Sequence, residues 1–456
     1  MIEYYRMSVH GRHPAEKSRV RRGSMKVGLV SLGCAKNQVD SEHMLYMLRE
    51  AGHTIVNDEK EAEVLIVNTC GFIDSAKEES IDAILRAASM KTEGRCVKVL
   101  VTGCLAQRYG RELMEEMPEI DGLLGVEKYA GFLRFFEESL EGKRPMDTGR
   151  TGEIFECGRI LTTQSTTAYV RIGEGCDNHC AFCAIPLIRG RCRSRDREAI
   201  LDEMRRLASE GVSEQILIAQ DTSCYGRDRG EKDGLISLLR EADEIPGIRW
   251  LRVMYLYAAD VDRAMIDAMA GIRHLCRYID IPLQHASRRV LKSMRRRGDI
   301  GKIEDTLMYA REKGFCLRTT FIVGFPGETE EDFEELMSFA GRVRFDRMGA
   351  FVYSPEEDTP AAAFEGAVDE DTARERLDRL MRLQQQISLE RGGTRVGETA
   401  EALVSEKSGG ILRCRSAWEA PDADGWILVP GDVPAGEWIS VRITGADIYD
   451  LRGEIV

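Results

Sequence analysis

Three cysteines near the middle of the chain have a spacing suited to metal binding. Cys176, Cys180 and Cys183 form a C-x-x-x-C-x-x-C motif. Three thiolates at this spacing can bind three corners of a cuboidal 4Fe-4S cluster, whose irons take Cys sulfur as ligands. The motif has no fourth cysteine, which leaves one iron open to a non-protein ligand, as in catalytic metal sites. The motif therefore predicts a catalytic iron–sulfur cluster.

Two alternatives remain for this motif. Zinc is one, since His179 stands beside Cys180 and zinc binds both Cys and His. Unrelated core cysteines are the other, because free Cys is among the most buried residue types. A structural zinc site normally has four protein ligands, so the missing fourth cysteine favours the cluster.

A second trio of cysteines is spread over the N-terminal part of the chain. Cys34, Cys70 and Cys104 lie 36 and 34 residues apart, in SLGC, NTCG and TGCL, and each has a Gly beside it. Each follows a continuous apolar run typical of a buried parallel strand; these runs are 27–32, 64–67 and 97–101. The carboxyl ends of parallel strands share one edge, where ligands bind. We therefore expect the three thiols to converge and to hold a second 4Fe-4S cluster.

Helical segments alternate with strands in two arrays. In the first, amphipathic stretches at 39–50, 75–88 and 111–117 follow the three strands, which predicts an open parallel α/β sheet in a domain at 25–150. The second array has six candidate strands: 168–172, 215–219, 251–256, 278–281, 317–323 and 348–353. Each ends in a polar or Gly/Pro-rich segment, as barrel enzymes do at their active edge. Six strands predict an incomplete (β/α)6 barrel, closed by a helix at 368–391, in a domain at 160–392.

The last part of the chain has a different pattern. From residue 393 to 456, short β-rich runs are broken by Gly, Pro and Asp, which predicts a small all-β barrel. From Val396 this module has eleven acidic and five basic residues. An acidic module suits a basic protein partner, and we expect Glu419, Asp422 and Asp424 to dock one.

Composition limits the classes of function. The 456 residues carry 64 Lys and Arg against 77 Asp and Glu, a net charge of -13, whereas proteins that bind nucleic acid mainly through phosphates are usually basic. No apolar run approaches the roughly 18 residues that cross a bilayer. Thirteen cysteines without a signal-like segment indicate a reducing compartment, so we expect a cytoplasmic protein. Residues 1–24 are expected to form a tail outside the folded domains.

The cysteine motifs resemble those of a known superfamily. GCDNHCAFCAIP, at 175–186, resembles the radical SAM superfamily, and the whole arrangement with a TRAM-like C-terminal barrel resembles its methylthiotransferases. The resemblance implies that the open iron of the second cluster binds S-adenosylmethionine and that its reductive cleavage yields a 5′-deoxyadenosyl radical. It also implies that the first cluster presents methylated sulfur to the substrate carbon.

Several stretches resemble one branch of that family in particular. SLGCAKNQVDSE, AQDTSCYG, IDIPLQHAS and FVYSPEEDT resemble the RimO-type branch, which acts on an aspartyl β-carbon of small-subunit ribosomal protein twelve. The implied partners are that protein, an electron donor such as flavodoxin or ferredoxin, and a sulfur source, with no direct tRNA binding. The alternatives are a MiaB-type tRNA adenosine methylthiotransferase and a non-catalytic iron–sulfur electron carrier.

Five further polar residues lie at the ends of the barrel strands or inside them. Gln284 and His285 are candidates for a catalytic role, although a buried histidine is more often structural. Candidates for contacts with S-adenosylmethionine are Gln220, Arg318 and Glu328.

Overall fold

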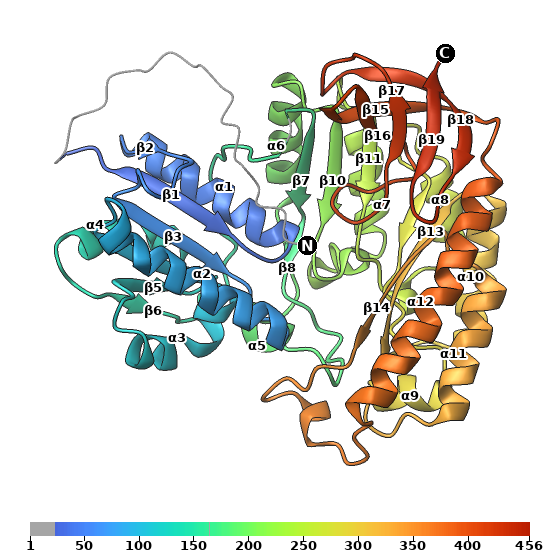
Figure 1. The fold of residues 1–456 in the computed structure, drawn as a ribbon, viewed down its shortest axis with the longest axis horizontal. Helices are drawn as coiled ribbons and strands as arrows, with labels where there is room; N and C mark the ends of the chain where they lie inside the picture. The colour runs from blue at the N-terminus through green and yellow to red at the C-terminus, as the bar shows by residue number, and fades with distance from the viewer. Residues whose placement is uncertain (1–22, 164) are drawn as a thin grey trace. The chain divides into compact units, whose positions relative to one another are not determined.

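The computed structural model describes residues 23–163 and 165–456, which form two compact units. The first unit contains the described residues up to Thr163 together with 173–177 and 183–195; the second contains the rest of the described chain. Figure 1 labels most of the helices and strands of both. Of the predicted tail at 1–24, all but Gly23 and Ser24 lie outside the described residues. The predicted domain boundaries at 150, 160 and 393 stay predictions.

A parallel sheet of six strands forms the centre of the first unit, in the order β2-β1-β3-β4-β5-β6. Its strands are β1 (Lys26–Ser31), β2 (Thr54–Ile55), β3 (Val64–Thr69), β4 (Lys98–Gly103), β5 (Gly122–Leu124) and β6 (Met146–Asp147). β3 and β4 are buried almost throughout, which explains their continuous apolar sequence. The predicted open parallel sheet is confirmed.

Four helices cover the two faces of this sheet: α1 (Ala35–Glu50), α2 (Asp74–Glu93), α3 (Cys104–Glu116) and α4 (Phe132–Leu140). Alternate side chains of β3 point to opposite faces. Leu65 and Val67 pack with α2 and α3, whereas Val64 and Ile66 pack with α1 and α4. Two separate apolar clusters therefore hold the strands in place, and with them the loops that follow.

The second unit contains six parallel strands in two groups, β11-β10-β7 and β12-β13-β14. They are β7 (Thr167–Arg171), β10 (Glu214–Ile218), β11 (Trp250–Val253), β12 (Tyr278–Asp280), β13 (Cys316–Val323) and β14 (Arg347–Val352). The Leu256 amide donates to the Asp280 carbonyl and links the two groups. The predicted incomplete barrel is confirmed, with β7 and β14 as its unpaired edges.

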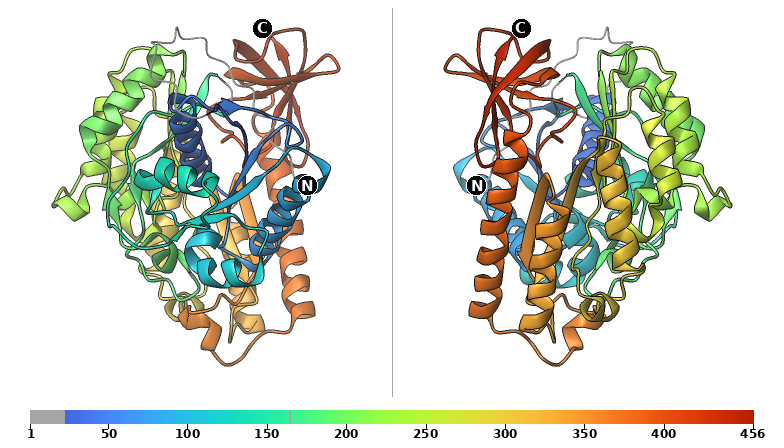
Figure 2. Two further views of the ribbon diagram at one scale, coloured as in Figure 1. Left: turned by 90° about the vertical axis from the view of Figure 1, so that its left-hand side faces the viewer. Right: turned by 90° about the vertical axis from the view of Figure 1, so that its right-hand side faces the viewer.

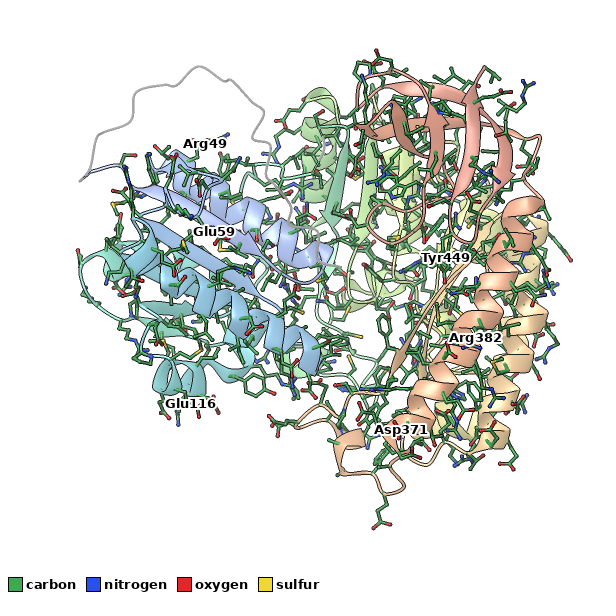
Figure 3. All side chains as sticks on the ribbon, in the orientation of Figure 1. Arg49, Glu59, Glu116, Asp371, Arg382 and Tyr449 are labelled. Carbon is green, nitrogen blue, oxygen red and sulfur yellow. The ribbon has the colours of Figure 1, made fainter. Side chains whose placement is uncertain are left out.

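Helices alternate with these strands. They are α6 (Arg197–Ser209), α7 (Gly234–Asp243), α8 (Arg263–Ala270), α9 (Arg288–Ser293), α10 (Ile300–Glu312), α11 (Glu330–Val343) and α12 (Glu370–Gly393). α10, α11 and α12 run side by side along the strands (Figure 1, Figure 2). α12 is the predicted closing helix, and the Asp369 carboxylate caps its first turn. Charged side chains such as Arg382 point outward (Figure 3). No helix in the described ranges is long and apolar enough to cross a bilayer.

A closed five-stranded barrel ends the chain, as predicted, in the order β15-β16-β17-β19-β18. Its strands are β15 (Thr399–Ser408), β16 (Ile411–Arg415), β17 (Ile427–Pro430), β18 (Trp438–Ala446) and β19 (Leu451–Ile455). Val404, Leu412 and Ile427 are fully buried in its interior. Trp438 packs edge-on against Trp250 of β11, with ring centroids 4.4 Å apart, and so anchors the module to the incomplete barrel.

The loop between β16 and β17 corrects one expectation from sequence. Glu419 is fully buried and accepts a hydrogen bond from Arg347 at 3.0 Å. Asp424 accepts one from the Tyr278 hydroxyl at 2.6 Å, and Asp422 accepts one from Tyr169 at 2.7 Å. The prediction that Glu419 and Asp424 dock a partner is wrong, because these buried carboxylates already bind the incomplete barrel. Asp422 is engaged by the same barrel.

This loop gives a testable expectation for stability. Glu419→Ala leaves the mostly buried Arg347 guanidinium without its carboxylate, which should lower the free energy of unfolding by about 3 kcal/mol. Glu406→Ala is the matched control, because Glu406 pairs with Arg413 at the exposed surface and its loss should cost below about 1 kcal/mol. Urea unfolding of the full chain measures both. Equal effects of the two substitutions would contradict the docking role of the loop.

Candidate functional site

The first cysteine trio stands at the carboxyl edge of the N-terminal sheet. Cys34 is the N-cap residue of α1, Cys70 follows β3 directly, and Cys104 opens α3 directly after β4. The three thiols lie near enough to act on one another electrostatically, since Cys104 and Cys34 both raise the pKa of Cys70. The structure therefore brings together three side chains that are far apart in sequence.

Burial and the neighbouring cysteines make the thiolate state of Cys70 and Cys104 unfavourable in the protein alone. Burial first, and then the neighbouring Cys104 and Cys34, raise the pKa of Cys70 to about 12. Burial also raises the pKa of Cys104, while the Arg189 guanidinium opposes that rise. A positively charged metal centre reverses this balance and deprotonates its thiol ligands. The donor set thus fits a bound metal cluster.

Two glycines allow the thiols to approach. Gly33 has φ +89°, and a Cβ there would stand 3.0 Å from the Cys70 sulfur. Gly103 has φ +98°, and a Cβ there would stand 2.3 Å from the Thr69 carbonyl oxygen. Both conformations are costly for residues with a side chain, and the space is filled as well. These positions require glycine immediately before Cys34 and Cys104.

The spacing of the donors also bears on what they hold. Among the described residues, no three His, Cys, Asp or Glu side chains converge closely enough to bind one metal ion. A cuboidal cluster attaches each thiolate to a different iron, so its ligands stand farther apart than those of a single ion. The trio at the carboxyl edge fits the first requirement of such a cluster, three thiols around a shared space.

The second cysteine motif lies in the segment between β8 (Gly173–Glu174) and β9 (Arg193–Ser194), which pair as a short antiparallel ladder. α5 (Ile185–Arg189) follows the motif within the same segment. Gly175, directly before Cys176, has φ +74°, and a Cβ there would stand 2.0 Å from the Arg191 carbonyl oxygen. The base of the loop is therefore closed tightly at its first cysteine.

In the second unit, the middle of the motif is tied to the residues after α9. The Ala181 amide donates to the Met294 carbonyl, and the Arg296 guanidinium donates to the Cys180 sulfur at 3.6 Å. Asn178 donates to Asp221, just beyond β10, at 2.6 Å. Cys180 is buried and carries a cationic neighbour, which suits an anionic ligand sulfur.

Four of the five other predicted residues lie beyond the carboxyl ends of barrel strands. Gln220 follows β10, Gln284 and His285 follow β12, and Glu328 follows β13. The structure does not bring Arg318 to that edge. Arg318 lies near the start of β13, where its guanidinium donates to Asp280 at 2.7 Å and stands 3.7 Å from Asp424. These ion pairs give Arg318 a structural position beside the C-terminal module.

His285 and Glu328 are buried neighbours beyond the ends of β12 and β13. His285 is fully buried, its Nδ1 accepts from the Ser287 amide at 3.0 Å, and its Nε2 stands 3.8 Å from the Glu328 carboxylate. Burial lowers the pKa of His285 to about 4, so the ring is neutral near pH 7. Burial raises the pKa of Glu328, which Arg376 holds at 3.1 Å. The Ser287 amide and the Arg376 guanidinium thus hold the two side chains in place.

Sequence reasoning missed two features of the site. His179, Tyr255 and Gln284 all have positive φ, which is uncommon outside glycine and concentrates at functional sites. Arg189 also lies in a buried polar cluster beside Cys104. No sequence signal reveals the positive φ angles. The polar residues near the start of α1, among them Asn37 and Asp40, are a sequence signal for the cluster around Arg189.

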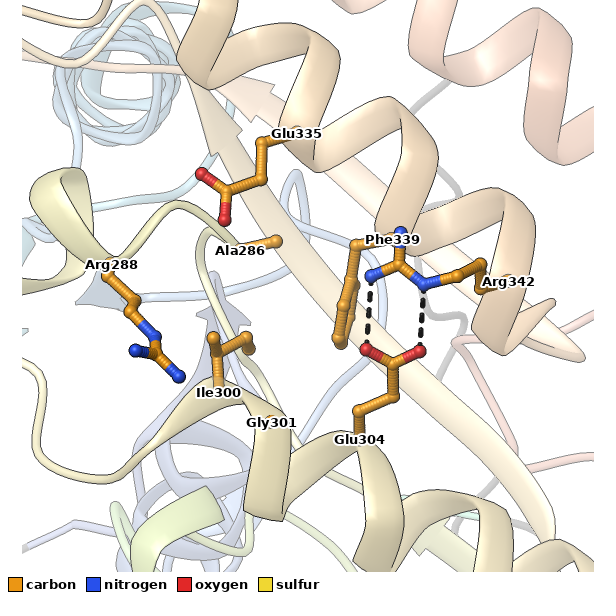
Figure 4. A pocket seen from close by; sticks show the side chains of 8 residues that line it. All are labelled: Ala286, Arg288, Ile300, Gly301, Glu304, Glu335, Phe339 and Arg342. Atoms are coloured by element: carbon orange, nitrogen blue, oxygen red, sulfur yellow. Dashed lines mark hydrogen bonds and ion pairs between the residues drawn. The ribbon is translucent and has the colours of Figure 1, made fainter.

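A pocket elsewhere in the second unit is separate from the predicted site residues. It has a volume of about 400 Å³ and lies outside the barrel, among residues of α10, α11 and the start of α9. Its lining residues, drawn in Figure 4, are Ala286, Arg288, Ile300, Gly301, Glu304, Glu335, Phe339 and Arg342. Arg342 and Glu304 form a two-point ion pair across it.

Three protein families match consecutive parts of the chain. Residues 26–125 match the uncharacterized protein family UPF0004, 170–340 match the radical SAM superfamily, and 396–456 match the TRAM domain. The radical SAM match begins near the end of β7, spans β10 to β13 and includes the C-x-x-x-C-x-x-C motif.

Curated relatives match nearly the whole chain. The ribosomal protein uS12 methylthiotransferase RimO of Heliobacterium modesticaldum is 46% identical over 95% of this chain and 95% of its own length. The protein of the same name from Pelotomaculum thermopropionicum is 48% identical over 95% of this chain and 99% of its own length. This chain belongs to the RimO family. Membership in this family also accounts for the three consecutive domain matches.

Solved structures support the fold. The radical S-adenosylmethionine methyltransferase TsrM from Kitasatospora setae, with cobalamin and a 4Fe-4S cluster bound, aligns with a TM-score of 0.55 and 13% identity over 90% of this chain and 79% of that chain. A second structure of TsrM, with tryptophan and a SAM analogue bound, aligns with a TM-score of 0.54 and 14% identity. The alignment covers 89% of this chain and 85% of that chain. At this identity the likeness concerns the fold of the RimO-family chain alone.

The glycine before Cys104 provides a test of the first trio. Gly103→Ala places a methyl group against the Thr69 carbonyl and should displace Cys104, so that iron in the reconstituted protein falls from about eight to about four atoms per chain. Gly52→Ala is the control, because Gly52 has a similar φ of +92° with nothing within 4 Å. Iron and sulfide analysis measures both variants. Full iron binding by Gly103→Ala would contradict the arrangement described for this trio.

Proposed function

We propose that this chain is a radical SAM methylthiotransferase that inserts a methylthio group at an aspartyl β-carbon of ribosomal protein uS12. One observation carries the proposal: a chain of the RimO family places a cysteine trio at the carboxyl edge of its parallel sheet and a C-x-x-x-C-x-x-C motif after the first strand of its barrel. Such edges are where enzymes of both architectures do their chemistry.

The proposed cofactors are two 4Fe-4S clusters and S-adenosylmethionine. Cys34, Cys70 and Cys104 would hold one cluster; the other would be held by Cys176, Cys180 and Cys183. When bound, these groups supply the radical and the sulfur that the reaction needs. The protein binds and orients them and excludes water. We propose Gln220, Gln284, His285 and Glu328 as residues that shape the barrel edge around S-adenosylmethionine.

The charge of the C-terminal module favours a protein substrate over tRNA. Each of its five cationic side chains forms an ion pair with a carboxylate; the pairs are Lys407–Asp432, Arg413–Glu406, Arg415–Glu214, Arg442–Glu454 and Arg452–Asp447. Binding to RNA backbones relies on cations that replace condensed counterions. TRAM domains suggest RNA binding as an alternative, but the cations of this one are already neutralised. We therefore propose that the module does not bind tRNA directly.

The remaining partners follow from the proposed reaction. Reductive cleavage requires an electron donor, for which we propose a flavodoxin or ferredoxin, and repeated turnover requires a sulfur source. The substrate is a ribosomal protein, so we propose that the enzyme acts in the cytoplasm, on uS12 alone or within the small subunit.

The two trios should have separable functions. Changing Cys176, Cys180 and Cys183 to Ala should halve the bound iron and abolish formation of 5′-deoxyadenosine. Changing Cys34, Cys70 and Cys104 to Ala should also halve the iron, but should leave 5′-deoxyadenosine formation intact and stop methylthio transfer. Iron analysis and chromatography of the nucleoside product measure these outcomes.

A control for these variants is Cys96→Ala, since Cys96 is buried in the first unit but lies outside the trio. It should keep all of the iron and both activities. Undiminished iron in either triple variant would contradict the assignment of that trio.

Binding of tRNA gives a further test. The full chain should bind total tRNA no more tightly than about 10 μM at physiological salt, because its C-terminal cations are paired. Neutralising the partners of four exposed cations, with Glu406→Gln, Asp432→Asn, Asp447→Asn and Glu454→Gln together, should tighten tRNA binding and steepen its dependence on salt. Tight, salt-sensitive binding by the unaltered chain would favour a tRNA substrate.

A further inference from the structure

Arg189, the last residue of α5, lies in a buried polar cluster of the first unit. Its side chain is 3% exposed. One guanidinium nitrogen, Nη1, donates to both oxygens of Glu174 at 3.1 Å. The other, Nη2, donates to Asn37 Oδ1 at 2.7 Å, to Asp40 Oδ2 at 3.0 Å and to the Cys104 sulfur at 3.7 Å. The planar fork of Arg suits such simultaneous contacts.

The partners of Arg189 connect it with both cysteine sets along the chain. Asn37 follows Cys34 by three residues in α1, and Cys104 is itself a member of the first trio. Glu174 precedes Cys176 by two residues, and Arg189 follows Cys183 by six. Arg189 and these four partners, Asn37, Asp40, Cys104 and Glu174, all belong to the first unit.

The electrostatic setting keeps Arg189 charged. Two buried carboxylates pair with the guanidinium, Glu174 at 3.1 Å and Asp40 at 3.0 Å. Buried carboxylates are costly unless they are paired and hydrogen-bonded, and here the guanidinium serves both. The cation is therefore fixed beside the Cys104 sulfur.

Other arginines of the same segment have different partners. Arg193 pairs with Glu127 at 3.3 Å, and Arg195 donates to Glu156 at 2.6 Å. These pairs connect the segment to the rest of the first unit through carboxylates. A purely structural role would be met by contacts of this kind, whereas Arg189 also contacts a thiol of the trio.

We propose that Arg189 is a positioning residue for the cluster held by Cys34, Cys70 and Cys104, and that its hydrogen bond and charge at the Cys104 sulfur raise the reduction potential of that cluster. The inference rests on the proposed function. Hydrogen bonds to cluster sulfurs and nearby positive charge stabilise the more negative, reduced state, and this is one of the main ways in which proteins set cluster potentials.

The test uses the full chain with Cys176, Cys180 and Cys183 changed to Ala, so that only the first trio can hold a cluster. In this parent, iron content and the midpoint potential of the cluster are measured, the latter by redox titration followed by electron paramagnetic resonance. Arg189→Met should keep the irons but lower the midpoint potential. Arg189→Lys, which keeps the charge but not the fork, should give a potential between those of Arg189→Met and the parent.

Two further variants make the result specific. Arg191→Met is the matched control, because the Arg191 side chain is 85% exposed and bonds Asp177 instead; its potential should equal that of the parent. Glu174→Gln keeps the shape of the acceptor and removes a neutralising charge, so it should raise the potential. If Arg189→Met does not fold, the Lys and Glu174→Gln variants decide the question.

The outcomes separate this inference from the proposed function. Four irons with an unchanged potential in the Arg189 and Glu174 variants would overturn the role of Arg189 and leave the proposed function standing. A parent chain that binds no iron would overturn the assignment of the first trio, and with it the role of Arg189. Altered potentials in the expected directions, with Arg191→Met unchanged, would support both.

Discussion

Thiolates that are held close together and away from water repel one another, and the N-terminal domain is built around that repulsion. Burial and the neighbouring cysteines raise the pKa of Cys70 to about 12, so the protein alone does not favour the Cys70 thiolate. The two apolar faces of the sheet supply the rigidity that holds the thiols together nevertheless. The proposed metal cluster would relieve the repulsion, and Arg189 places one positive charge beside Cys104.

In the second unit, buried carboxylates of the loop between β16 and β17 are also matched by donors. Glu419, Asp422 and Asp424 bind Arg347, Tyr169 and Tyr278, respectively, and thereby attach the C-terminal module. Glu419 and the Asp424 side chain are buried, and removing such carboxylates from water is costly unless each is matched by a donor. Some of the acidic residues of the module thus attach it to the incomplete barrel. Its cationic side chains form ion pairs with carboxylates.

Much of this architecture was predictable from the sequence, because its signals are local. A cysteine directly after a β-branched run, with glycine beside it, identifies a thiol at a strand end, and repetition in three β/α units predicts convergence. The six barrel strands and the closing helix are equally periodic. Strands β2 and β6, only two residues each, are too short to give a pattern.

The features that the sequence did not reveal depend on long-range contacts. Tyr278 and Asp424 are 146 residues apart, and nothing local indicates that this carboxylate is buried. Arg318 has the charge to contact a cofactor, but it lies near the start of β13. There its guanidinium pairs with Asp280 and stands beside Asp424. The partners of Arg189 are up to 152 residues away in the chain. The ligand roles of the six cysteines stay predictions until they are measured.

The most direct test of the central claim is a competition reaction with the anaerobically reconstituted full chain. The chain is supplied with S-adenosylmethionine, a reductant and a sulfide source, and with purified uS12 and total tRNA together. Mass spectrometry of the protein and of the digested tRNA then locates any methylthio group. We expect one methylthio group in place of a hydrogen on an aspartyl residue of uS12, and none on tRNA. A methylthio group on tRNA adenosine with unmodified uS12, or intact clusters that cleave S-adenosylmethionine and modify neither, would contradict this account.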